Sequence, residues 1–252
     1  MNKKILLLGD SCKDIYHFGT CDRLSQEAPV PIFQESRTET KGGMSANVKN
    51  NLESFGISVK HATNENTIEK HRFFDTKFNA HVLRFDKGKV ETSFVFDRLK
   101  ETGYNFDAIV ISDYDKGFLT SFHIKTLCEI FKDTPIFADS KKKDLSCFKD
   151  CFLKINEKEY RESNGIGRNV ELIVTLGEKG AEYNGCIFST KSREVFDVCG
   201  AGDVFLSALV YGVLDSGSIE KSIDLANKAA TLSVSKAQTY VLSDKDIKEI
   251  KK

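Results

Sequence analysis

Short apolar runs alternate with amphipathic segments along most of the chain. The runs are three to five residues long, as expected for strands buried on both faces, and the amphipathic segments repeat with helical spacing. Such alternation predicts an α/β fold with a mostly parallel central sheet and helices on both of its faces. Ligands are then expected beyond the carboxyl ends of the strands. The predicted strands are Ile5–Leu8, Ala108–Ser112, Ile136–Ala138, Cys151–Ile155 and Leu172–Thr175, and the predicted helices are Ala46–Ser54, Ser121–Phe131, Asp203–Leu214 and Ile219–Lys236.

Three further segments do not follow this alternation. Pro29–Glu35, Lys70–Thr76 and His81–Asp86 are short, extended in character, and rich in Phe, Val and charge. Plain surface hairpins are the alternative, but their Phe side chains would then lack burial. We therefore expect a separate small β-sheet.

Composition narrows the class of protein. The 252 residues are 40% hydrophobic and carry 37 basic and 37 acidic side chains. A formal net charge of zero argues against nucleic acid as a partner, and no apolar run reaches the length that spans a membrane. Seven cysteines without a C-x-x-C pair indicate reduced thiols and a cytoplasmic protein.

The segment from Asp197 to Phe205 carries the clearest candidate chemistry. It reads Asp-Val-Cys-Gly-Ala-Gly-Asp-Val-Phe and leads into a predicted helix. Glycines at a helix start let backbone N–H groups approach an anion, and the helix dipole favours negative charge there. Asp203 would be repelled by a phosphate but can accept a proton from an attacking hydroxyl. An ordinary glycine-rich turn before a helix explains the local sequence equally well.

The wider sequence resolves this choice through a resemblance. Asp-x-x-Gly-Ala-Gly-Asp-x-Phe resembles the C-terminal signature of the ribokinase-like (PfkB) carbohydrate kinases. The segments Glu27–Pro31, Gly42–Val48 and Ile111–Gly117 resemble the kinase domain of the bacterial D-glycero-D-manno-heptose 7-phosphate kinases. The resemblance implies a single ribokinase-like domain over 1–252, with a β lid from about 16–37 and 68–97.

The resemblance also implies an activity and its cofactors. The reaction would be ATP-dependent phosphorylation of the anomeric hydroxyl of that sugar phosphate, with Mg²⁺ as cofactor. A requirement for a monovalent cation stays open. The lid often forms a dimer interface in this family, so a homodimer is expected.

The same resemblance assigns roles to the chemistry-bearing residues. Asp203 would be the catalytic base, and the amides of Gly200, Ala201 and Gly202 would form the anion hole. The expected nucleotide-binding residues are Lys141, Asn156, Glu159, Thr175, Gly177, Gly180 and Asn227. Asn156 and Glu159 would organise Mg²⁺ largely through water, although the pair also fits a capped helix start.

The expected sugar site combines two kinds of residue. Asp14 and Asn47 can hydrogen-bond vicinal hydroxyls, and Gly42 and Gly43 let the chain approach the ring. A cation for the existing phosphate is sought among Arg23, Lys70, Arg72 and Arg84, with no choice among them.

The chain is shorter than the relatives that it resembles. The gaps fall after Gly56 and between Asn156 and Thr175. Two alternatives therefore stay open: a kinase of another sugar or sugar phosphate, and a catalytically weak ligand-binding derivative of the fold.

Overall fold

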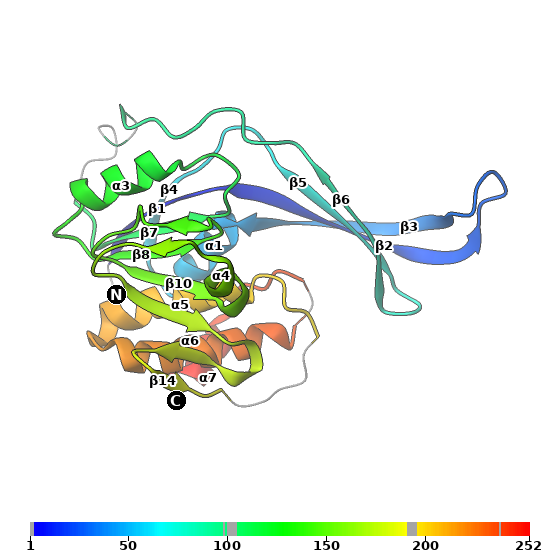
Figure 1. Cartoon of the computed structure of the whole chain (residues 1–252). Coiled ribbons are helices and arrows are strands. Elements are labelled where there is room, and N and C mark those ends of the chain that lie inside the picture. The colour runs from blue at the N-terminus through cyan, green and yellow to red at the C-terminus, as the bar shows by residue number, and fades with distance from the viewer. Residues whose placement is uncertain (1–2, 98, 100–104, 191–195, 237) are drawn as a thin grey trace.

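A computed structural model describes residues 3–97, 99, 105–190, 196–236 and 238–252. Its largest element is an eight-stranded sheet with the order β14-β13-β12-β10-β8-β7-β1-β4 (Figure 1). The strands from β12 to β4 in this order pair in parallel, and β13 and β14 add an antiparallel edge. The strands are β1 (Lys4–Gly9), β4 (Ser58–Ala62), β7 (Ala108–Asp113), β8 (Ile136–Ser140), β10 (Phe152–Asn156), β12 (Glu171–Thr175), β13 (Ala181–Tyr183) and β14 (Cys186–Phe188).

Helices cover both faces of this sheet, because successive residues of each strand point to opposite sides. Ile5 and Leu7 of β1 pack with helices α1, α5, α6 and α7, whereas Leu6 and Leu8 pack in a second cluster with α3. The helices are α1 (Ser45–Ser54), α3 (Ser121–Ile130), α4 (Glu157–Glu162), α5 (Ala201–Ser216), α6 (Ile219–Val234) and α7 (Asp244–Ile250), with a 3₁₀ turn at Gly177–Lys179. The expected α/β fold class is confirmed.

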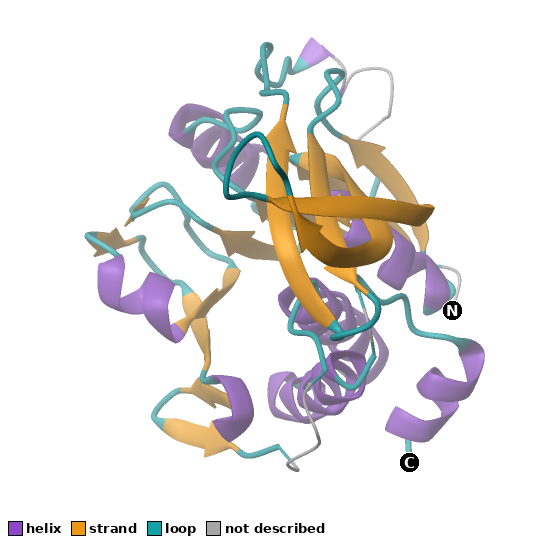
Figure 2. Ribbon diagram, turned by 90° about the vertical axis from the view of Figure 1, so that its right-hand side faces the viewer, coloured by secondary structure: helices purple, strands orange, loops and turns teal. Residues whose placement is uncertain are grey.

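A second, four-stranded sheet with the order β3-β2-β5-β6 projects from the core (Figure 1). Its strands are β2 (Ser11–Leu24), β3 (Pro31–Met44), β5 (Glu69–Asp75) and β6 (Ala80–Lys87). Figure 2 views this small sheet from its free end. Two further short strands, β9 (Asp144–Leu145) and β11 (Gly165–Ile166), pair with each other.

The expected elements all form, and their ends lie within a few residues of the predicted bounds, with one larger exception. The strand expected at Pro29–Glu35 continues to Met44, so its last residues include Gly42 and Gly43. The helix expected from Asp203 already begins at Ala201, with Gly200 as its left-handed N-cap. Residues 88–97 form no strand of the small sheet.

None of the helices in the described part of the chain combines the length and apolar character that crossing a bilayer requires.

Candidate active site

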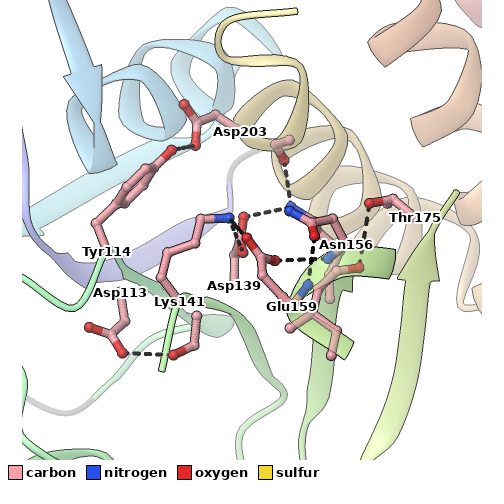
Figure 3. Close-up of polar contacts among 12 residues, drawn as sticks. Asp113, Tyr114, Asp139, Lys141, Asn156, Glu159, Thr175 and Asp203 are labelled. Carbon is pink, nitrogen blue, oxygen red and sulfur yellow. Dashed lines mark hydrogen bonds and ion pairs between the residues drawn. The ribbon is translucent and has the colours of Figure 1, made fainter. Parts of the chain in front are cut away.

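Asp203 lies in the first turn of α5 and is 98% buried (Figure 3). Its Oδ2 accepts a hydrogen bond from Asn47 Nδ2 at 3.0 Å, and its Oδ1 accepts one from the Tyr114 hydroxyl at 2.7 Å. Asn47 comes from α1 and Tyr114 follows β7, so three elements converge on one carboxylate. Both oxygens are therefore held in fixed directions.

Burial raises the pKa of Asp203 from 3.8 to about 6. The hydrogen bonds from Asn47 and Tyr114 oppose this rise, because they stabilise the carboxylate form. The negative charge of Asp139 adds to the rise, and the ammonium of Lys154 counteracts it. A carboxyl with a pKa near 6 is ionised at neutral pH and accepts a proton more readily than an ordinary aspartate.

Neighbouring side chains lie so close to the two glycines before Asp203 that a larger residue would clash with them. Gly200 has a φ of +78°, and a Cβ there would lie 2.7 Å from Asn47 Nδ2. A Cβ on Gly202 would lie 2.8 Å from Lys154 Nζ. Ala201 and Gly202 line the adjacent cavity, where the start of α5 provides a field that favours anions, and the Ala201 N–H donates to the Val198 carbonyl at 3.3 Å.

An ion-pair network lies at the carboxyl ends of β8 and β10 (Figure 3). Lys154 Nζ contacts Asp139 Oδ2 at 2.6 Å, and both residues are at least 97% buried. Lys141 Nζ lies 3.6 Å from Asp139 Oδ1 and 2.5 Å from Glu159 Oε1. Asp139 Oδ1 is buried and has no hydrogen-bond donor among the described residues.

Asn156 and Glu159 form a reciprocal capping box at the start of α4. Glu159 N donates to Asn156 Oδ1 at 2.9 Å, and Asn156 N donates to Glu159 Oε2 at 2.8 Å. The capped helix start that the sequence allowed is therefore present. It holds the amide and the carboxylate at the edge of a cavity.

A cavity of about 280 Å³ lies between the start of α5, the end of β12 and helix α6. Ala201, Gly202, Phe205 and Val198 form its wall on the α5 side. Asn227 of α6 also lines it, and its Nδ2 donates to the Phe188 carbonyl at 2.7 Å. The cavity brings together five of the seven residues expected at the nucleotide, namely Asn156, Thr175, Gly177, Gly180 and Asn227. Lys141 and Glu159 lie next to it, because Glu159 is bonded to Asn156.

The expected sugar residues lie where the small sheet meets the core. Asp14 is buried and forms an ion pair with Arg72 of β5. Gly43 packs directly on the Asp14 carboxylate, where a Cβ would clash. Asn47 reaches Asp203, so the two halves of the site share one residue.

The expected phosphate-binding cations do not gather at one point. Arg72 is engaged by Asp14, and Arg84 is half-exposed and binds Asp86 through two hydrogen bonds of 2.7 and 2.8 Å. Arg23 is exposed near the far end of β2. Lys70 is buried, and its Nζ lies 5.4 Å from the centroid of the Tyr114 ring.

Three residues of the site carried no role in the sequence-based prediction. Tyr114 follows β7 directly, Asp139 is the second-last residue of β8, and Lys154 lies in the middle of β10. For Tyr114 the available signal was its position after a buried strand, because ligand sites of parallel sheets lie at this edge. For Asp139 and Lys154 the signal was a charged residue within an otherwise apolar strand. The site therefore combines a buried base, Asp203, with a helix start that attracts anions and lines a cavity. Such an arrangement can transfer a phosphoryl group to a hydroxyl.

Comparison with known proteins agrees with this architecture. A family model described as "pfkB family carbohydrate kinase" matches residues 157–246. The chain is 32% identical over 308 aligned positions to the bifunctional protein HldE of a Nitratiruptor species, an alignment that covers 99% of this chain and 65% of that relative. The bifunctional protein HldE of Campylobacter jejuni is 31% identical, with the same coverage. The chain thus spans slightly less than two thirds of these relatives.

Solved structures show the same fold at low identity. Phosphofructokinase-2 from Escherichia coli in complex with potassium has a TM-score of 0.77 at 14% identity, with 99% of this chain and 98% of that chain covered. Arabidopsis thaliana ribokinase complexed with ribose and ATP has a TM-score of 0.70 at 16% identity, with 99% of each chain covered. The chain thus has a ribokinase-like fold with a Gly-Ala-Gly-Asp helix start, matches the pfkB family of carbohydrate kinases over residues 157–246, and is similar to the HldE proteins over nearly its whole length.

Proposed function

We propose that this chain is an ATP-dependent sugar kinase that acts on D-glycero-D-manno-heptose 7-phosphate and yields the 1,7-bisphosphate. The observation that carries the proposal is the buried Asp203 at the start of α5, next to a cavity that the Ala201–Gly202 turn lines. The named sugar is supported by the similarity to the HldE proteins over nearly the whole chain.

In this proposal Asp203 accepts the proton of the anomeric hydroxyl. The sugar oxygen forms a bond to the γ-phosphorus, and the bond from that phosphorus to the ADP oxygen breaks. Asn47 and Tyr114 hold the carboxylate toward the attacking hydroxyl through their hydrogen bonds. The amides of Gly200, Ala201 and Gly202 stabilise the charge on the transferring group.

The nucleotide would occupy the 280 Å³ cavity, with Thr175, Gly177, Gly180 and Asn227 along it. Lys141 would face its phosphates. Mg²⁺ supplies charge neutralisation to those phosphates when bound. Both Glu159 oxygens already accept contacts, from Lys141 and from Asn156 N, so the capping box fits an ion held through its water shell.

The small sheet would act as the lid of a single kinase domain over 1–252. Its outer face carries Leu83 and Phe85, which are more than half exposed, beside Phe73. We include in the proposal that this face forms the contact of a cytoplasmic homodimer.

The test is ADP release from Mg-ATP across a panel of sugars and sugar phosphates, in potassium and in sodium salts. We expect turnover with the heptose 7-phosphate, and we expect Asp203→Asn to lower kcat by at least roughly 1,000-fold while sugar binding persists. Asp215→Asn is the matched control, because Asp215 is an exposed aspartate on the same helix.

The panel also separates the alternatives. Turnover with another sugar only would keep the chemistry and reject the heptose. A folded protein that binds ATP but turns over no member of the panel would be a ligand-binding derivative of the fold.

A further inference from the structure

Among the residues that the structure describes, three cations are buried: Lys70, Arg72 and Lys154. Arg72 pairs with Asp14, and Lys154 pairs with Asp139. Lys70 is 91% buried, yet no carboxylate of the described chain lies within 4 Å of its Nζ, which lies over the Tyr114 ring at 5.4 Å from the ring centroid. A buried ammonium without a counterion is costly, so its place in the site calls for an explanation.

The neighbours of Lys70 could have neutralised it but are otherwise engaged. Asp14 is its partner across β2 and Asp86 its partner across β6, so all three side chains share one face of the small sheet. Asp14 is bound by Arg72, and Asp86 is bound by Arg84. This face therefore holds one more cation than it holds carboxylates among these five residues, and Lys70 is the unpaired one.

The position of Lys70 points to the acceptor rather than to the nucleotide. The residues that line the 280 Å³ cavity include none from the small sheet. Tyr114 contacts Lys70 on one hand and Lys141 on the other, with ring-centroid distances of 5.4 and 5.6 Å, and Lys141 is tied to Glu159 at the nucleotide side. The Tyr114 hydroxyl donates a hydrogen bond to Asp203, and Lys70 lies over the Tyr114 ring. Lys70 is also paired across the strands with Asp14 in the small sheet, so it lies on the Asp14 side of the base.

We propose that Lys70 binds an anionic substituent, a phosphate, on the sugar acceptor, and that Arg23, Arg72 and Arg84 do not. The proposal rests on the proposed function, because it takes the Asp14 side of the site as the acceptor side. An incoming phosphate supplies the counterion that the free protein lacks, whereas Arg72 and Arg84 would have to leave their carboxylates first.

The test compares matched ligands and needs no turnover. Binding of mannose and mannose 6-phosphate, and of D-glycero-D-manno-heptose 7-phosphate, is measured by calorimetry without nucleotide for the wild type, Lys70→Met and Lys70→Arg. We expect the wild type to prefer the phosphorylated sugars and Lys70→Met to bind them roughly 10- to 100-fold more weakly, with binding of the neutral sugar unchanged. Lys70→Arg should keep most of the preference. Lys87→Met is the control, since Lys87 lies on the same sheet and is 67% exposed.

A second readout separates binding from structure. Removing an uncompensated buried charge should leave the urea midpoint of ligand-free Lys70→Met at or above that of the wild type. A lower midpoint would mean that Lys70 stabilises the fold and would overturn the proposal.

Three other results would overturn the assignment. They are a wild type without preference for the phosphorylated sugars, a preference that survives in Lys70→Met, and a loss confined to binding of a non-hydrolysable ATP analogue. A wild type that binds the sugar phosphate in this way but releases no ADP would instead refute the proposed kinase activity and leave Lys70 assigned.

Discussion

Replacing Asp203 by Asn should change how the stability of the protein depends on pH. The folded-state pKa of Asp203 is about 6, against 3.8 for an unperturbed aspartate, because the group is fully buried. Between these two values the folded chain keeps a proton that the unfolded chain has lost. The free energy of unfolding therefore falls as pH rises through this window.

The magnitude follows from the shift. A difference of about two pKa units corresponds to about 3 kcal/mol, at 1.36 kcal/mol per unit. The stabilising contribution is complete below pH 3.8 and is lost once pH exceeds about 6. An Asn at this position cannot ionise, so the variant avoids the loss. Its stability relative to the wild type should rise by about 2.4 kcal/mol between about pH 4 and about pH 7.5, because at pH 4 more than half of the unfolded chains have already lost this proton.

Equilibrium unfolding in urea at both pH values measures this difference. The difference in unfolding free energy between the variant and the wild type is taken at each pH, and the change of this difference from one pH to the other is the result. Any fixed cost of placing an amide opposite the Asn47 side chain cancels in that change. Asp215→Asn on the same helix controls for the loss of a carboxylate. A gap between Asp203→Asn and the wild type that is equal at both pH values, or that shrinks as pH rises, would refute the inferred ionisation cost.

Two further changes test the surroundings of the base. Tyr114→Phe removes a hydrogen bond that lowers the pKa of Asp203, so the acidic limb of the pH profile of kcat/KM should move to higher pH. Tyr183→Phe is the control: the Tyr183 hydroxyl bonds Glu171, so its loss should leave the profile unchanged. Lys154→Met leaves the Asp139 carboxylate buried without its 2.6 Å partner and should cost about 3 kcal/mol in urea unfolding. A loss below about 1 kcal/mol would mean that Lys141 takes over the pairing, in which case the double change with Lys141→Met should unfold at much lower urea.

Local pattern was enough to predict the core elements. The central strands are continuous apolar runs, and α6 repeats its apolar residues at 3.6-residue spacing, so short-range sequence carries their signal. Helix α5 is instead buried without a break from Asp203 to Gly212. The capping box of Asn156 and Glu159 is likewise local, because its two residues are three apart. The position of Asp203 at a helix start follows from the glycines before it.

Strand β2 shows where local pattern fails. Ser11–Leu24 mixes buried and exposed positions and carries polar residues on both faces, so it lacks the apolar run of a core strand. It forms because β3 and β5 pair with it along most of its length. That pairing joins segments more than 50 residues apart for β5, which no window of sequence contains.

The pairing of Asp14 with Arg72, which is 58 residues away in the sequence, was decided by tertiary structure. The sequence presents Lys70, Arg72 and Arg84 as equal candidates for binding the phosphate of the sugar. In the structure Arg72 forms an ion pair with Asp14 and Arg84 forms one with Asp86, whereas Lys70 has no carboxylate partner among the described residues. The same holds for Tyr114, whose hydroxyl meets a carboxylate 89 residues away. The sequence determines which groups can ionise or donate, but their pairing depends on distances of a few ångströms between elements, because electrostatic and hydrogen-bond energies fall steeply with separation.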